Sequence, residues 1–208
     1  MQVLRAPNPL LRVQTKPVKK LTLSLLQTFK DMVKLTKTFK DPEGVGLAST
    51  QIGLDGQYFV AKVDGSERTR RQASEDRDSA DSQSEAILRI KGSDRASSNR
   101  EEKFITVINP KITWTSKKTK IYFEGCLSIP LYWGDVNRYL SIKVTYMDET
   151  GKVIKTSLKG VMAWIFQHEI DHLNGKLFVD RVLEQKGKFY KNVGKDKTGT
   201  DIFEEVTI

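Results

Sequence analysis

The chain has 208 residues, which suits one domain of ordinary size with room for an insertion or a tail. Hydrophobic residues make up 38% of it, a share that indicates a normal core mixed with a non-globular segment. The formal net charge is +9, from 35 Lys and Arg against 26 Asp and Glu, and such a charge attracts RNA, phospholipid or a ribosome surface. No apolar run of about 18 residues is present, so neither a membrane helix nor a membrane partner is expected.

The N-terminal residues and the single cysteine bear on the compartment and on the possible chemistry. Residues 1–7 lack the pattern of a secretory signal, and they are not an Arg- and Ser-rich transit sequence, so the cytoplasm is the expected compartment. The sequence shows no RNA-binding fingerprint and no alternation of aromatic and basic residues, so no DNA partner and no base-specific recognition is expected. Cys126 is the single cysteine, which excludes an intrachain disulfide. A lone cysteine is most often a small buried hydrophobe, and a functional role for it requires partners elsewhere.

The first predicted element is an amphipathic helix at residues 21–40, where apolar side chains recur at helical spacing. Pro42 and Gly44 end it, because proline cannot continue a helix and glycine permits the exit turn. Gly44 and Gly46 then open a glycine-rich segment that another backbone can approach closely, although a plain turn is the alternative. Residues 58–61 are predicted to form a short strand.

Residues 64–100 differ sharply from the rest of the chain. They contain eight Ser, and their eight Lys and Arg balance eight Asp and Glu. Ala73 and Ala80 are the only apolar residues between positions 64 and 84, so this stretch cannot bury enough surface to offset its ordering entropy. We therefore predict an inserted loop or extended hairpin, with a candidate strand at residues 86–90.

The second half of the chain predicts strands around one buried helix. The strands are expected at residues 104–108, where Asn109-Pro110 ends the first, and at residues 112–114, 121–123, 140–147 and 153–158. A turn joins the last two into a hairpin. Residues 161–174 form a helix that is apolar around much of its circumference and therefore central, with Gly175 as its cap. The predicted fold class is α+β, with short, mostly antiparallel strands packed around this helix and an additional N-terminal helix. The expected domain spans residues 1–183, and residues 184–208 form a tail.

The central helix carries a metal-binding motif. His168 and His172 are the only histidines, and Glu169 lies between them in the pattern HExxH. Histidines at positions i and i+4 project from one helical face, near enough to share a metal ion. The alternative is a pair of solvated or core histidines that bind nothing.

Two histidines do not complete a hydrolytic centre, which normally has three protein ligands and an open position. In one metalloprotease class the motif continues to a third histidine, and Phe178 at that position excludes the class. Glu184 is a poor candidate for a ligand from a later helix, because no helix is evident around it. Cys126 is the better third ligand, since a thiolate binds a borderline metal more strongly than a carboxylate does.

Three segments together resemble the peptide deformylase family. They are the GφGφAxxQ segment at residues 44–51, the EGCLS segment at residues 124–128 and the QHExDH segment at residues 167–172, in the order of that family. The Pro-Asn-Pro-Leu-Leu-Arg run at residues 7–12 and a strand expected at residues 177–180 also look similar to the family. The likeness covers residues 1–62 and 103–183, and it leaves out the insertion and the tail.

The resemblance implies a hydrolase that removes the formyl group from the N-terminal formyl-methionine of nascent polypeptides and releases formate. It implies one divalent metal ion held by Cys126, His168 and His172. The family likeness points to Fe²⁺, with Zn²⁺, Ni²⁺ or Co²⁺ as alternatives, whereas general affinity rules favour zinc over ferrous iron.

The resemblance also implies roles in catalysis. A water activated by the metal attacks the formyl carbon, and Glu169 accepts the proton of that water and passes it to the leaving amine. The developing oxyanion is stabilised by the metal, the side-chain amide of Gln51 and the backbone N–H of Leu127.

The substrate is expected to bind by strand addition beside Gly46, whose lack of a side chain would leave room for it. The predicted substrate-binding residues are Val45, Gly46, Glu124, Gly125, Trp164 and Ile165. Trp164 lies one helical turn before His168 and would line the methionine pocket. Trp133 stands near a position where the family usually has glycine, and core packing is an equal alternative for both tryptophans. Glu124 and Arg138 are expected to form a buried pair, against the alternative of a surface pair worth about 1 kcal/mol or less.

Two rival functions remain at this stage. A metalloprotease of unblocked peptides would cleave internal bonds, whereas a deformylase would release formate only. A structural metal site would need a fourth protein ligand, and the sequence has no further Cys or His to supply one. The tail carries Lys186, Lys188, Lys191, Lys195 and Lys197. It could contact ribosomal RNA, although a solvated tail is the simpler interpretation.

Overall fold

The protein is shown here as a computed structural model, which describes residues 1–40, 42–63 and 102–207. The insertion predicted at residues 64–100 and its candidate strand at 86–90 lie outside the described residues. No helix in the described part is long and apolar enough to cross a membrane. In chain order the elements are η1 (Pro9–Arg12), α1 (Leu23–Thr38), β1 (Gly46–Ala48), η2 (Ser49–Ile52), β2 (Tyr58–Val63), β3 (Lys103–Thr115), β4 (Thr119–Cys126), β5 (Ile129–Tyr139), β6 (Ser141–Met147), β7 (Val153–Lys159), α3 (Gly160–Leu173), α4 (Phe178–Gln185), β8 (Phe189–Lys195) and β9 (Asp201–Val206).

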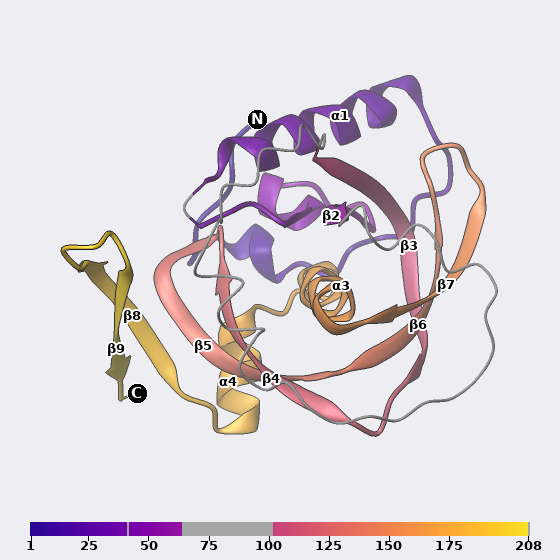
Figure 1. The fold of residues 1–208 in the computed structure, drawn as a ribbon. Helices are drawn as coiled ribbons and strands as arrows, with labels where there is room; N and C mark the ends of the chain where they lie inside the picture. Colours follow the sequence, from indigo (N-terminus) through magenta and orange to yellow (C-terminus); the bar gives the residue numbers. More distant parts are fainter. Residues whose placement is uncertain (41, 64–101, 208) are drawn as a thin grey trace.

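The described strands form two sheets. One has the order β1-β2-β3-β6-β7 and the other the order β4-β5-β8-β9, and the strands within each are paired antiparallel. Figure 1 looks along α3 and shows the strands curving around it. The predicted α+β class, with mostly antiparallel strands around the HExxH helix, is confirmed. The predicted hairpin of β6 and β7 is confirmed as well.

The central helix α3 packs against the concave face of the five-stranded sheet. Phe166 of the helix meets Phe59 of β2 edge to face, with the ring centroids 5.1 Å apart. Ile142 and Val144 of β6 belong to the same buried cluster. Because so many of its positions are covered by strands, α3 is buried on several sides, as its apolar sequence predicts.

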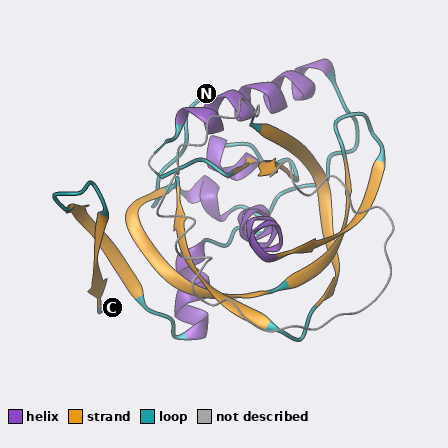
Figure 2. Cartoon of the chain, viewed as in Figure 1, coloured by secondary structure: helices purple, strands orange, loops and turns teal. Residues whose placement is uncertain are grey.

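The N-terminal helix α1 covers part of the opposite, convex face of the same sheet. Its buried Phe29 and Met32 contact Tyr58 and Val60 of β2 and Ile108 of β3. This helix begins after Thr22, whose hydroxyl accepts a hydrogen bond from the N–H of Leu25. The sheet is therefore covered by α3 on one face and by α1 on part of the other (Figure 2).

One predicted boundary is wrong. Separate strands are expected at residues 104–108, ended by Asn109-Pro110, and at residues 112–114, whereas β3 runs without interruption from Lys103 to Thr115. Asn109 adopts a φ of 51° and the pairing with β6 shifts register there, so the strand accommodates the proline in a bulge. The Asn109 side chain bonds both the N–H and the C=O of Val18, which anchors this bulge.

The strand expected at residues 177–180 is also wrong, because α4 occupies this segment. Its Phe-Val sequence has strand propensity, but Phe178 and Val182 one turn apart are buried together, which is helical spacing. The Asp180 carboxylate accepts a hydrogen bond from the N–H of Leu177 and caps the helix. Glu184, which the sequence analysis placed in no helix, lies in α4 and pairs with Lys176 rather than with the histidines.

The C-terminal part of the chain is more ordered than a tail. Residues 184–208 include the strands β8 and β9, for which no strand was predicted, and β8 pairs with β5. In Figure 1 this hairpin lies at the left of the view, where it forms one edge of the four-stranded sheet. Strand β5 was likewise not predicted, and it folds back on β4 directly after the Cys126 segment.

Candidate metal centre

The site is built where strand β4 runs beside helix α3. Side chains on one face of a strand recur every second residue, and side chains on one face of a helix recur about every fourth. Consecutive members of the two series meet in three pairs, Tyr122 with Trp164, Glu124 with His168 and Cys126 with His172. The periodicities of one strand and one helix are therefore enough to bring the motif residues together.

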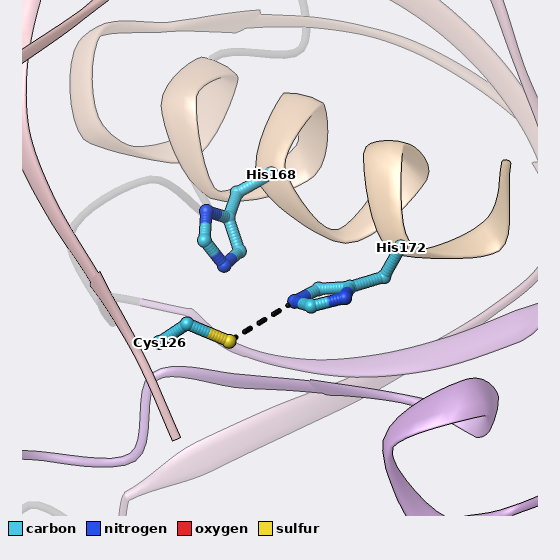
Figure 3. Close-up of side chains that lie close together, drawn as sticks. All are labelled: Cys126, His168 and His172. Atoms are coloured by element: carbon cyan, nitrogen blue, oxygen red, sulfur yellow. Dashed lines mark hydrogen bonds between the residues drawn. The ribbon is translucent and has the colours of Figure 1, made fainter. Parts of the chain in front are cut away.

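The structure brings the three predicted metal ligands into one cluster. One ligand atom from each of Cys126, His168 and His172 lies within 4.8 Å of the others. The Cys126 Sγ atom is 3.2 Å from Nε2 of His172, and Figure 3 shows the His168 ring converging on the same space. One sulfur and two imidazole nitrogens around a common point are a donor set for a borderline divalent ion.

The charge state of the Cys126 thiol also suits the binding of a metal ion. Burial opposes the thiolate form of Cys126, but the imidazoles of His172 and His168 outweigh burial and lower the thiol pKa to about 5. Ligation by cysteine requires the thiolate. The residues present therefore fit a metal ion with three protein ligands.

A buried ion-pair network orients His168. The Nδ1 atom of His168 is 2.8 Å from Oε2 of Glu124, which leaves Nε2 to face Cys126. Arg138 bonds both oxygens of Glu124, at 2.7 and 2.9 Å, and the two side chains are only 5% and 0% exposed. Burial raises the pKa of Glu124, but the hydrogen bonds from Arg138 and His168 outweigh it and lower the pKa below its usual value. The expected buried pair of Glu124 and Arg138 is confirmed.

Gln51 points its amide nitrogen at the cluster. Its Oε1 accepts a hydrogen bond of 2.8 Å from the N–H of Ala48, so the NH₂ group must face the other way. Nε2 lies 3.4 Å from Cys126 Sγ and 3.2 Å from Ser128 Oγ. The short helix η2 that follows β1 holds the side chain in this position.

Glu169 is buried beside the ligands without sharing their contacts. Its Oε2 atom has no hydrogen-bond partner within the described part of the chain, and burial raises the pKa of the carboxyl to about 7. A β-carbon added at Gly46 would lie 2.2 Å from Oε1 of Glu169. The absence of a side chain at Gly46, which is expected to leave room for the substrate, also leaves room for this carboxylate.

The predicted substrate residues fall into two groups. Val45 and Gly46 lie at or next to β1, the edge strand of its sheet, where a further strand could pair. Gly125 follows Glu124 in β4, and Leu127 comes directly after Cys126 in the turn to β5. These positions border the cluster.

The other substrate residues have contacts of their own. Ile165 belongs to the buried core cluster of α3, and Glu124 is committed to Arg138 and His168. Trp164 stacks on Tyr122 at a centroid distance of 5.2 Å and an interplanar angle of 10°. Its Nε1 atom is buried without a partner among the described residues.

Two residues of the QHExDH segment have roles that the sequence did not reveal. The Gln167 side chain bonds both the N–H and the C=O of Tyr139, at 3.0 and 2.9 Å, and so ties α3 to the end of β5. Asp171 accepts hydrogen bonds from Arg138 and Arg181. The motif that carries these polar residues on a buried helix was the only available signal for both.

This fold and this arrangement of a thiolate, two imidazoles and an adjacent buried carboxylate define a metal-dependent hydrolase. Comparison with known proteins gives the family. The pattern described as polypeptide deformylase matches residues 1–188. The peptide deformylase of Mesorhizobium japonicum is 34% identical over 195 residues, which are 92% of this chain and 91% of that protein. That of Thermotoga neapolitana is 31% identical over 86% of this chain and 85% of that protein.

Solved structures agree with the sequence comparison. Peptide deformylase from Thermotoga maritima superposes with a TM-score of 0.65 at 29% identity, covering 86% of this chain and 95% of that one. The enzyme from Synechococcus elongatus, solved in complex with actinonin, gives a TM-score of 0.65 at 29% identity and covers 87% and 78%. The chain belongs to the polypeptide deformylase family. It is a hydrolase that removes the formyl group from the N-terminal methionine of new polypeptides.

Proposed function

We propose that Cys126, His168 and His172 hold the single divalent ion of this deformylase and that Glu169 transfers the protons of the reaction. The observation that carries the proposal is the approach of the three ligand atoms to within 4.8 Å of one another, next to a buried carboxylate. A bound divalent ion supplies Lewis acidity at the formyl group.

The surrounding side chains supply the remaining chemistry. Glu169 accepts a proton at its carboxylate from the attacking water and returns it to the leaving nitrogen, and a pKa of about 7 suits both steps. Gln51 donates its Nε2–H to the developing oxyanion, because Ala48 already occupies its oxygen. The N–H of Leu127 is the second donor. Glu124 and Arg138 keep the His168 ring in one orientation throughout.

The substrate adds as a strand along the free edge of β1, beside Val45 and Gly46. The stacked rings of Tyr122 and Trp164, which lie one step before Glu124 on β4 and one turn before His168 on α3, then form a wall for the methionine side chain. Sulfur–aromatic contacts favour a thioether at such a wall. Gly125 is proposed to bind the substrate through its backbone, because its α-carbon faces Trp133 on the other side of β4.

The native ion is proposed to be Fe²⁺, with Zn²⁺, Ni²⁺ or Co²⁺ as substitutes. A thiolate with two imidazoles accepts each of these ions, so availability and reactivity decide between them. Metal analysis of protein purified without oxygen tests this proposal directly. Zinc at full occupancy with full activity would contradict it.

The expected partners are nascent formyl-methionyl chains in the cytoplasm. We retain the division into a catalytic domain of residues 1–183 and a C-terminal segment of residues 184–208, and the exposed Lys191 and Lys197 of that segment are candidates for ribosome contact. Co-sedimentation of ribosomes with the Lys191→Glu/Lys197→Glu protein tests this contact. Sedimentation equal to wild type would dispose of it.

The decisive experiment measures formate release from formyl-Met-Ala under anaerobic conditions, with metal analysis of the same sample. We expect one equivalent of formate per peptide, one ion per chain, and no cleavage of internal bonds. Cleavage of unblocked peptides at internal positions would show that the site acts as a protease instead.

A further inference from the structure

The convex face of the five-stranded sheet has a part that α1 does not cover. Strand register places side chains of β3, β6 and β7 side by side there, with Lys111 opposite Thr145 and Thr145 opposite Lys155. The next row pairs Trp114 with Lys143, and Ser141 pairs with Lys159 beyond it. We call these residues the lysine–tryptophan face: Lys111, Trp114, Lys143, Lys155 and Lys159.

Trp114 is unusually accessible for its residue type. It is 49% exposed, although tryptophan is highly buried on average. The ammonium group of Lys143 lies over its ring, 5.4 Å from the centroid. The indole therefore offers a flat apolar surface to the solvent in the middle of a cationic region.

The strand segments that carry these lysines, residues 111–114, 141–145 and 155–159, contain no acidic residues. Elsewhere on the described surface, lysines are often neutralised, as in the pairs Lys16–Asp55 and Lys188–Glu205. Within the described part of the chain, no ion pair is formed by Lys111, Lys143, Lys155 or Lys159. Positive charge is therefore concentrated here.

We propose that the lysine–tryptophan face binds single-stranded RNA without sequence preference. Lysines contact phosphates, and an exposed aromatic ring stacks on a base of any type, which is how sheet surfaces bind single strands. Charge complementarity selects a polyanion, and the tryptophan selects one that carries planar groups. A lipid surface fits less well, because Thr113 and Ser157 around the ring are polar and no second apolar anchor accompanies it.

The face is separate from the metal centre. Ile142 and Val144, which alternate with Lys143 along β6, point to the opposite side of the sheet and pack on α3. The sequence hid this surface because its members come from three strands, and Trp114 and Lys143 meet only through the pairing of β3 with β6. RNA bound there would leave the site beside Cys126 open to a formyl-peptide.

Binding of a fluorescein-labelled oligouridine to the full-length protein, followed by fluorescence anisotropy at several salt concentrations, tests the proposal. The charge-reversal variant is Lys143→Glu/Lys155→Glu, and the matched control is Lys30→Glu/Lys34→Glu on the exposed side of α1. We expect the first to weaken binding at least tenfold and to flatten the slope of log K against log salt by roughly 1.4, at about 0.7 per phosphate contact. The control variant should change the affinity far less, although the two variants have the same net charge.

A second variant isolates the stacking. Trp114→Ala should weaken oligouridine binding about tenfold with an unchanged salt slope, since the ring no longer stacks on a base and no charge changes. Deformylation of formyl-Met-Ala should stay at the wild-type rate in every variant. Equal losses in the two charge-reversal proteins would overturn the proposal by showing that only net charge matters. Binding to anionic phosphatidylserine vesicles in place of RNA would also overturn it.

Discussion

The two faces of strand β4 are built from different kinds of side chain. The inner face carries Tyr122, Glu124 and Cys126, which meet α3, while the outer face carries Phe123 and the bare backbone of Gly125. On the inner face, hydrogen bonds and charge position each residue. On the outer face, aromatic rings pack against one another. The position of Cys126 depends on both faces, because a loss of packing on either face lets the whole strand shift.

Aromatic rings from the C-terminal hairpin close the outer face. Phe123 stacks on Trp133 of β5, with centroids 5.3 Å apart and planes at 11°. Phe203 of β9 meets Phe123 edge to face at 4.9 Å, and Tyr190 of β8 does so at 5.2 Å. The Trp133 ring lies so close over Gly125 that a β-carbon there would come within 2.8 Å of it.

The outer face draws on a part of the chain that the inner face does not use. The family pattern matches residues 1–188 and so includes the whole inner face, whereas Tyr190 and Phe203 lie beyond it. The C-terminal hairpin supports the outer face of the strand that bears a metal ligand. Variants on each face should therefore lose function in different ways.

The largest effect is expected for Cys126→Ala on the inner face. Removing the thiolate leaves two histidine ligands, so both metal content and formate release should fall to background. Metal analysis after desalting and an activity assay measure this. Ile121→Ala, an exposed position on the same strand, is the control and should keep both. Full metal occupancy in Cys126→Ala would show that the ligand assignment is wrong.

Glu169→Ala should separate catalysis from ligation. The carboxylate is buried beside the ligands, but no predicted ligand depends on it, so the protein should keep its metal and its fold. Loss of proton transfer should lower kcat by roughly 10²–10⁴-fold with little change in KM. Wild-type turnover in the metal-replete variant would falsify the proposed mechanism.

Gln51→Ala should have the next largest effect. It removes one donor to the oxyanion, which typically lowers kcat by about 10²–10³-fold. The cavity left by a buried side chain adds a loss of stability that a urea titration measures separately. A large rise in KM with unchanged kcat would instead assign Gln51 to substrate binding.

The inner face could be predicted from the sequence because its chemistry uses rare residues in local motifs. The only cysteine and both histidines fall in two short segments, and their strand and helix periodicities predict which way they point. The buried Glu124–Arg138 pair was expected because both residues match positions of the family. Asp171 and Gln167 escaped because their partners, Arg181 and Tyr139, are distant in sequence or are backbone groups.

The outer face could not be predicted, because it depends on non-local strand pairing. Nothing near Phe203 indicates that β9 lies two strands from β5, and a sequence rich in lysine resembles a solvated tail. Residues 177–180 show the reverse problem. Their local sequence favours a strand, but the burial of Phe178 together with Val182 in the folded protein overrides that preference and produces a helix.

Phe203→Ala should test the outer face. The variant removes the edge-to-face packing of this ring on Phe123 and on Trp133. Each ring pair is worth about 0.5–1.5 kcal/mol, so the free energy of unfolding should fall by roughly 1–3 kcal/mol. Because β4 then has less support, affinity for Co²⁺ in a chelator competition should also fall, while KM stays unchanged. Phe203→Leu should restore part of both losses. Ile202→Ala, an exposed neighbour on β9, should change neither.

The smallest effect is expected for a deletion within the insertion that connects β2 to β3. Deleting residues 66–84 removes a stretch whose only apolar residues are Ala73 and Ala80, so no core packing should be lost. β2 and β3 stay registered through the pair Val63–Lys103, and the ion pair between Lys62 and Glu102 at 3.1 Å holds the same end of the sheet. Roughly halving the connection should stabilise the protein by only about 0.6 kcal/mol, because loop-closure entropy varies slowly with length. Turnover of formyl-Met-Ala should therefore match wild type. A large increase in KM would show that this segment shapes the substrate site, in addition to the two faces of β4.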